Sequence, residues 1–197
     1  MRKRKVSLPF LLGIGLILCS LCLLLVHQIR LSAGARTCRE AVSQIQSLLP
    51  ERTQGVPGTY PNTNMPVLEI GGTDYCGILE VPAFGITLPV ANHWDGKKLL
   101  SAPRRYYGSV YDGSLVIGGA DDARQFAFCR QIQIGAVITV TDMTGAQFSY
   151  TVSSVDRTRY ADTAWLTQSG CQLVLFCRDP ASFGYLAVRC ISTTQAQ

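Results

Sequence analysis

Cysteine and histidine are the residues of this sequence whose side chains serve nucleophilic chemistry. The 197 residues include eight cysteines and two histidines. Cys177 ends the apolar run Leu173–Cys177, and His93 stands between Asn92 and Trp94. A cysteine attacks a carbonyl carbon only as the thiolate, so it needs a neighbour that lowers its pKa or takes its proton. Whether Cys177 is reactive therefore depends on the side chains that the fold brings to it.

Six cysteines lie beyond the N-terminal apolar segment: Cys38, Cys76, Cys129, Cys171, Cys177 and Cys190. Six cysteines allow fifteen pairings, so the sequence assigns no disulfide. If Gln172–Cys177 and Tyr185–Ile191 form a hairpin, Cys171 and Cys190 come close across it, either as a disulfide or as two unpaired buried thiols. The adjacent carboxylates of Asp121 and Asp122 lack the spaced partners of a cation site and are typical of a solvated turn. We expect no metal and no cofactor.

The composition excludes two broad classes of protein. With 47% hydrophobic and 16% charged residues, the chain is too apolar to be disordered. Its formal net charge is +5, but Arg2, Lys3, Arg4 and Lys5 supply four of these charges, and 5 minus 4 leaves +1 for the rest. A nucleic-acid-binding role therefore has no support.

The run Ser7–Val26 has about twenty residues without a charge, enough for a helix to cross the hydrocarbon layer of a bilayer. The basic residues before it place the N-terminus in the cytoplasm and the domain outside, in a single-pass topology. The alternative is a signal peptide cut near Ala33–Ala35, although its apolar region would be unusually long.

The chain divides into five predicted parts. Residues 1–6 form a cytoplasmic tail and residues 7–27 a transmembrane anchor. Residues 28–74 hold a juxtamembrane helix at Arg36–Leu49, stopped by Pro50, and a surface linker at Thr53–Pro66 rich in Gly, Pro, Asn and Thr. Residues 75–193 form the globular domain, and residues 194–197 form a tail.

Short β-rich runs between turn signals recur through the globular domain and predict an all-β fold. Their number favours a barrel or sandwich of seven or eight strands. Asp142–Gln147 is a hairpin turn containing Gly, and Lys97–Leu100 and Thr163–Gln168 are short helical turns. The runs are YCGILEV, ITLPV, SLVIGG, AVITVTD, QFSYTVSSV, CQLVLFC and YLAVRCI.

In order and spacing, these segments resemble the sortase family, the membrane-anchored cysteine transpeptidases of mostly Gram-positive bacteria, and class B members in particular. The resemblance covers Tyr75 to Ile191. It rests on ILEVPAFGITLPV (Ile78–Val90), PRRYYGS (Pro103–Ser109), SLVIGGADD (Ser114–Asp122), LVLFCRD (Leu173–Asp179) and YLAVRC (Tyr185–Cys190). It implies a sortase-like β-barrel of seven or eight strands with short helices, preceded by the transmembrane helix and the juxtamembrane helix.

The family's chemistry implies a Cys, a His and an Arg at the site. The thiolate attacks a peptide bond of a sorting signal, the imidazole moves the proton of the leaving group, and the guanidinium stabilises the oxyanion. In this sequence the position of the catalytic His falls on Ala120, and that of the Arg falls on Tyr185. A methyl group moves no proton, and a phenol carries no fixed positive charge.

The position of the nucleophile has two alignments. It falls on Cys177 when the segment is aligned from the left, and on Arg178 in the gapless alignment from the right. Side chains alternate faces along a strand, so only one of the two residues lies in the cleft. His93 is expected on a loop, and Arg189 matches a second, non-catalytic arginine of related sequences.

Three functions follow from these observations. The first is a degenerate sortase that keeps a role in binding peptides or assembling surface proteins or pilins, with Ala120, Arg178 and Tyr185 as vestigial positions. The second is an active transpeptidase with Cys177 as nucleophile, joining sorting-signal proteins to the cell wall or to pilins. The third is a structural exported domain stiffened by disulfides. Position 120 distinguishes the first two, because general acid–base catalysis is worth about 10² to 10⁴-fold.

Overall fold

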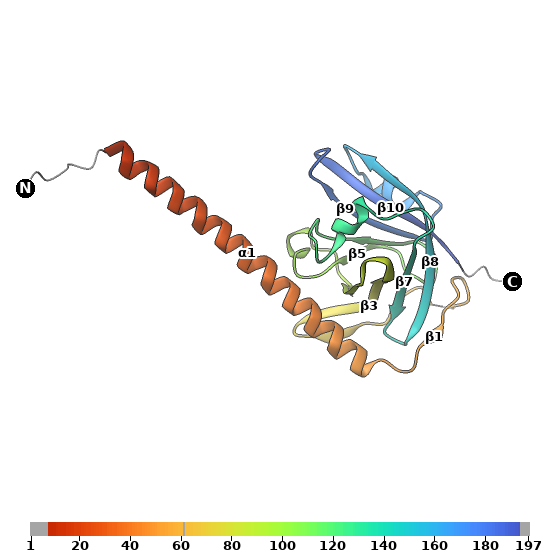
Figure 1. Cartoon of the computed structure of the whole chain (residues 1–197). Coiled ribbons are helices and arrows are strands. Elements are labelled where there is room, and N and C mark those ends of the chain that lie inside the picture. Colours follow the sequence, from red (N-terminus) through yellow and green to blue (C-terminus); the bar gives the residue numbers. More distant parts are fainter. Residues whose placement is uncertain (1–7, 61, 194–197) are drawn as a thin grey trace, which may run out of the picture.

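The computed structural model describes residues 8–60 and 62–193. One long helix is followed by a β-barrel with short helical segments (Figure 1). The strands are β1 (Thr53–Gln54), β2 (Leu68–Ile70), β3 (Thr73–Val81), β4 (Ile86–Ala91), β5 (Arg104–Tyr107), β6 (Leu115–Gly118), β7 (Val137–Asp142), β8 (Ala146–Thr158), β9 (Leu173–Asp179) and β10 (Gly184–Ser192). The helices are α1 (Leu8–Leu48), η1 (Pro82–Phe84), η2 (Gly96–Lys98), η3 (Phe126–Arg130) and α2 (Thr163–Thr167).

Eight of the described strands close into a ring. The order is β8, β10, β9, β6, β5, β4, β3 and β7, and β7 pairs again with β8. The short strands β1 and β2 add to β8 and β3 outside this ring. The expected all-β barrel of seven or eight strands with short helices is therefore confirmed, and the closure leaves few free strand edges.

Alternation along the strands fills the inside of the barrel. In β8 the side chains of Ala146, Phe148, Tyr150 and Val152 are buried and alternate with partly exposed ones. η3 contributes to the same core through Phe126, which is fully buried. This two-residue period is the pattern that predicted the strands from the sequence.

The turn between β7 and β8 is the hairpin that the sequence predicted. Gly145 has a φ of +85°, a conformation that a side chain would strain. The fully buried carboxylate of Asp142 accepts hydrogen bonds from the Tyr111 hydroxyl at 2.6 Å, from Thr144 N at 2.8 Å and from Ala146 N at 2.9 Å. Asp142 thus ties the turn to the loop before β6.

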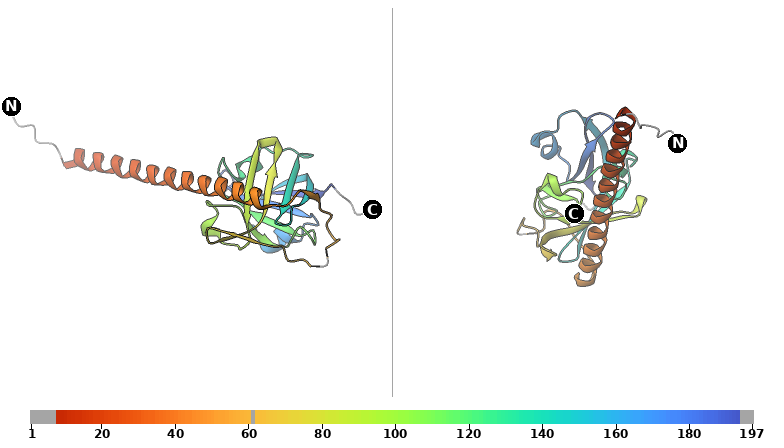
Figure 2. Two further views of the ribbon diagram at one scale, coloured as in Figure 1. Left: turned by 90° about the horizontal axis from the view of Figure 1, so that it is seen from below. Right: turned by 90° about the vertical axis from the view of Figure 1, so that its left-hand side faces the viewer.

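Helix α1 is continuous where the sequence divided an anchor from a juxtamembrane helix. After Pro9, no proline interrupts it before Pro50. Its C-terminal part lies along the barrel (Figures 1 and 2) and buries Gly34, Cys38, Ala41 and Ile45, which share one helix face. This face packs on a cluster from β3, β4 and the loop before β5 that contains Tyr75, Ile78, Ala91 and Ala102.

The predicted transmembrane helix has no separate counterpart in the fold. Within the described part of the chain, no helix reaches the length and apolarity that a membrane crossing requires. The cytoplasmic tail at residues 1–6, the first residue of the predicted anchor and the tail at residues 194–197 lie outside the described residues.

The segment predicted as a surface linker packs on the barrel instead. A Cβ atom at Gly55 would lie 2.6 Å from the ring of Phe148, so only glycine allows this approach. The Tyr60 ring stacks on Tyr111 with centroids 4.3 Å apart, and Met65 is buried. The segment holds few apolar residues, but Tyr60 and Met65 both pack against the hydrophobic core of the barrel.

We expect Gly34→Leu to release α1 from the barrel. A Cβ atom at Gly34 would lie 2.2 Å from the backbone oxygen of Leu100. Burial raises the pKa of the Cys38 thiol to about 11, and the thiol donates to Ser101 O at 2.8 Å. Release lets this pKa fall toward the ordinary value, so alkylation of Cys38 at pH 8 should accelerate by about two orders of magnitude.

Peptide mapping by mass spectrometry after a short pulse of iodoacetamide measures this rate. Gly15→Leu is the matched control, because a Cβ atom at Gly15 meets nothing within 4 Å. Equal rates for Cys38 in the two variants would contradict the packing of α1.

Candidate functional site

The three vestigial positions lie at the ends of three neighbouring strands. β6 and β9 run parallel with Gly118 opposite Phe176, and Gly119 N donates to Phe176 O at 3.0 Å. Continuing this register places Ala120 beside Arg178. β9 and β10 are antiparallel, as expected for the two runs, with Tyr185 opposite Arg178. Strand pairing thus brings together residues that are far apart in sequence.

Arg178 and Tyr185 form a contact on the outside of the barrel. The guanidinium carbon of Arg178 lies 5.5 Å from the centroid of the Tyr185 ring, within the range of a cation–π interaction. Arg178 is exposed and Tyr185 partly buried. The pair can bind anionic or carbonyl groups, but it holds no nucleophile.

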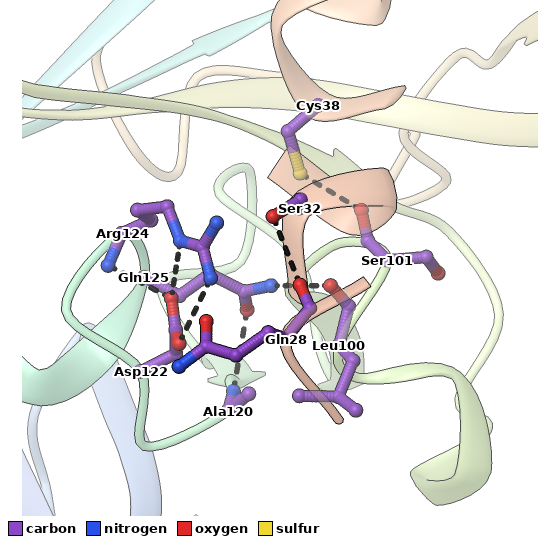
Figure 3. Close-up of polar contacts among 9 residues, drawn as sticks. All are labelled: Gln28, Ser32, Cys38, Leu100, Ser101, Ala120, Asp122, Arg124 and Gln125. Atoms are coloured by element: carbon purple, nitrogen blue, oxygen red, sulfur yellow. Dashed lines mark hydrogen bonds and ion pairs between the residues drawn. The ribbon is translucent and has the colours of Figure 1, made fainter. Parts of the chain in front are cut away.

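The loop that carries Ala120 is held by hydrogen bonds of the Gln125 side chain. Ala120 N donates to Gln125 Oε1 at 3.3 Å, and Gln125 Nε2 donates to Leu100 O at 3.0 Å. Figure 3 shows these bonds, and beside them the separate hydrogen bond from the Cys38 thiol of α1 to the backbone oxygen of Ser101, the residue after Leu100. The loop is therefore linked to α1 through the Leu100–Ser101 segment, and at position 120 it presents a methyl group.

Cys177 lies on the opposite face of β9, inside the barrel. It is 2% exposed, and its thiol donates to Phe126 O at 3.8 Å. Its neighbour Cys129 has a pKa raised well above the ordinary value, first by burial and then by the hydrogen bond with Cys177. The surroundings of Cys177 are therefore core side chains and the buried thiol of Cys129.

His93 and Arg189 have structural partners of their own. The His93 side chain is 76% exposed, with Nε2 at 3.5 Å from Asp74 Oδ2. Arg189 is buried on the outer face, donates to Asp156 and to Trp165 O, and lies 4.9 Å from the Trp165 ring. His93 lies on the loop after β4, as the sequence predicted, and Arg189 is held by partners on β8 and α2.

All eight cysteines belong to the described residues, and each of them is a free thiol. The disulfides that the third alternative required are therefore absent from the described residues. Burial raises the pKa of Cys190 to about 12, and the neighbouring Cys171 adds to this shift. The two residues are close, as the hairpin implied, but unpaired.

The two adjacent carboxylates are held in ion pairs. Asp121 pairs with Arg130 at 2.6 Å and Asp122 with Arg124 at 3.0 Å. No group of three or more candidate metal ligands occurs among the described residues. The ion pairs fix the turn that follows Ala120.

A cavity of about 570 Å³ between α1 and the barrel has no counterpart in the sequence analysis. α1 contributes Cys38 and Val42, the segment around β4 contributes Phe84 and Ile86, and the turn after β6 contributes Arg124. Leu100 from the loop before β5 completes the lining, and the sequence holds no signal for the cavity because its walls come from these four separated segments.

The fold agrees with solved sortase structures. A sortase D5 transpeptidase from Clostridium perfringens is similar at a TM-score of 0.55 and 14% identity, over 83% of this chain and 99% of that one. Sortase C1 from Streptococcus agalactiae is similar at 0.53 and 19%, over 65% and 72%. Sortase E1 from Streptomyces coelicolor, solved with a tripeptide in its active site, is similar at 0.50 and 18%, over 61% and 88%.

No family model matches the sequence, and no curated protein matches it. At these identities the likeness establishes the fold alone. The chain has a sortase-like fold, as its sequence motifs indicated. Its activity has to be argued from its own residues.

Proposed function

We propose that this chain is a catalytically degenerate, sortase-like protein that is anchored in the membrane and binds peptide segments of surface proteins or pilins. The observation that carries the proposal is the set of side chains at the three neighbouring strand ends. A methyl group, a guanidinium and a phenol stand at Ala120, Arg178 and Tyr185. None of them is a nucleophile at neutral pH, and none is an imidazole.

The active-enzyme alternative needs Cys177 to reach a substrate. The thiol is 2% exposed and lies on the inner face of β9, among core residues. To attack a peptide it would have to leave the core together with the end of its strand. Cys177 therefore supports the core rather than catalysis in this proposal.

A peptide partner fits the outer face beside the vestigial positions. Phe176 packs against Trp94 and Tyr106 there, with ring centroids 5.6 and 5.5 Å apart. Trp94 is 40% exposed, so part of this aromatic surface is open to a ligand. The tripeptide in the active site of sortase E1 is consistent with a peptide partner.

The membrane anchor is argued from apolar surface. The large hydrophobic side chains of α1 from Ile14 to Val26 are exposed, several of them by more than half, including Leu16 at 71% and Leu23 at 67%. So much apolar surface is unfavourable in water, and the basic residues before it favour a cytoplasmic N-terminus. The barrel is then extracytoplasmic on a single-pass anchor.

The test of the proposal is an assay for thioacylation. We expect the full chain in detergent to form no covalent adduct with sorting-signal peptides and to release no cleavage product, measured by intact-mass spectrometry. The losses of the proton shuttle and of the guanidinium each remove a few kcal/mol of barrier lowering. Peptide binding, followed by fluorescence anisotropy, should persist and weaken in Phe176→Ala.

Cys177→Ala serves as the control for the thiol. An adduct that forms on the unmodified chain and disappears in Cys177→Ala would replace the degenerate reading with the active enzyme. If the chain neither reacts with sorting-signal peptides nor binds them, the proposed function is wrong and only the sortase-like fold remains established.

A further inference from the structure

Two large aromatic side chains are exposed at the end of the barrel where β8 ends and the β9–β10 hairpin turns. Phe183 in the hairpin is 90% exposed, and Tyr160, just after β8, is 82% exposed. β8 and β10 are antiparallel with Tyr185 opposite Thr158. Continuing this register by two residues brings Phe183 level with Tyr160. Both rings therefore lie at this end of the barrel, and we call the two together the aromatic patch.

Folding does not explain the residue type at position 183. Among the described residues, Phe183 is the one non-glycine residue with a positive φ, at +52°. A bulky residue is strained in this conformation, and glycine adopts it freely. The side chain also has no part in the three hydrophobic clusters of the fold. Strain of this kind is found where a side chain serves a contact outside the fold.

Arginines surround the aromatic patch. Arg157, Arg159 and Arg178 are exposed, and the partner of Arg157 at 3.5 Å is the buried carboxylate of Asp179. Asp179 offsets Arg157, and the exposed Asp162 offsets one of the other two arginines, so three arginines less two carboxylates give this end a net charge of +1. Exposed aromatic rings bordered by arginines are the composition of a surface that lies among anionic lipid headgroups.

The patch lies on the side of the barrel toward which α1 rises. Figure 1 shows the end of β8 and the β9–β10 hairpin at the top of the barrel, and the right view of Figure 2 shows them at the same end as the N-terminal half of α1. Eight residues of helix, about 12 Å, separate Val26 at the end of the apolar run from the buried Gly34. The apolar run therefore ends about two helical turns before α1 meets the barrel at Leu100.

We propose that the end of the barrel formed by Tyr160, Phe183 and the surrounding arginines rests on an anionic lipid surface. The inference builds on the proposed membrane anchor. Arg178 and Tyr185 adjoin this surface, so a peptide reaches the vestigial positions along the membrane. We name a lipid surface as the binding partner because the patch and the exposed apolar half of α1 lie toward the same end of the molecule.

The test places an indole at each end of β10. Phe183→Trp and Ile191→Trp are prepared as full chains in nanodiscs of phosphatidylcholine with and without phosphatidylglycerol. Ile191 is the matched control, since it is 48% exposed and lies near the opposite end of the strand. A lipid with a spin label on its headgroup quenches nearby indoles, and Trp94 and Trp165 give the same background in both variants.

We expect the added indole of Phe183→Trp to lose most of its emission in discs that contain phosphatidylglycerol, and that of Ile191→Trp to lose little. Adding Arg159→Glu and Arg178→Glu to the Phe183→Trp variant should restore the emission. Each arginine near an anionic surface raises the membrane partition coefficient about fivefold, and the two glutamates remove this attraction. Equal quenching at the two positions would overturn the inference. The inference would also be overturned if the indole of Phe183→Trp escaped quenching only in discs that hold two copies of the chain. Such a result would indicate a contact between two chains.

Flotation with vesicles separates this inference from the anchor on which it builds. A chain that floats without quenching at position 183 keeps the anchor and overturns the lipid contact. A chain that does not float overturns both.

Discussion

The triple change Ala120→His, Arg178→Cys and Tyr185→Arg is expected to create a reactive thiol on the outer face of the barrel. Position 178 is exposed and pairs with position 185, and the register of β6 with β9 brings position 120 alongside. An ordinary cysteine, with a pKa of about 8.5, is about 1% thiolate at pH 6.5. Neighbouring imidazolium and guanidinium groups lower that pKa, so alkylation at pH 6.5 should accelerate at least tenfold.

Arg178→Cys alone is the control for exposure without activation. The rates are measured with iodoacetamide and peptide mapping, and incubation with sorting-signal peptides then shows whether a thioacyl adduct forms. If the thiol reacts no faster in the triple variant than in Arg178→Cys, the three positions do not form one site. All three residues are at the barrel surface or partly exposed, so we expect the barrel to tolerate the changes.

Asp142→Ala is expected to lower the free energy of unfolding by about 3–5 kcal/mol. The carboxylate is fully buried, and it accepts hydrogen bonds from Tyr111, Thr144 and Ala146. Removing it leaves the Tyr111 hydroxyl and the Ala146 amide buried without an acceptor, at a cost of about 1–3 kcal/mol each. Urea unfolding followed by tryptophan fluorescence measures the loss.

Asp112→Ala is the matched control for this prediction. Asp112 also accepts several hydrogen bonds, from Ser109 N and from Ser114 N and Oγ, but it is exposed. Water replaces its lost contacts, so we expect a change of about 1 kcal/mol. If the two variants lose similar free energies of unfolding, burial is not the reason that Asp142 stabilises the fold.

Local signals were sufficient for most of the strands. Alternating apolar residues predicted β7 and β8, and the Gly-containing turn between them predicted their hairpin. Local signals failed at the N-terminal side. The Gly- and Pro-rich segment before β2 lacks periodicity, yet it packs on the barrel through Gly55 and Tyr60. Single close contacts of this kind leave no periodic trace in a sequence.

The order of motifs along the chain indicated which three positions to compare, and their residue types led us to predict a site without the imidazole and the catalytic guanidinium. The sequence left open whether Cys177 or Arg178 faces outward. Strand alternation requires opposite faces for the two, but it does not say which face is the core. Only the closed ring, with β9 between β6 and β10, puts Cys177 against Phe126 and leaves Arg178 beside Tyr185.

The sequence by itself determined seven of the ten described strands and the hairpin turn between β7 and β8, because each depends on residues that are neighbours along the chain. The tertiary structure alone decided the inner face of β9, the packing of α1 through Gly34, and the meeting of Phe183 with Tyr160. Each of these depends on pairing between segments far apart in sequence. Local propensity carries no information about such pairing, since it is selected by the burial of the whole core.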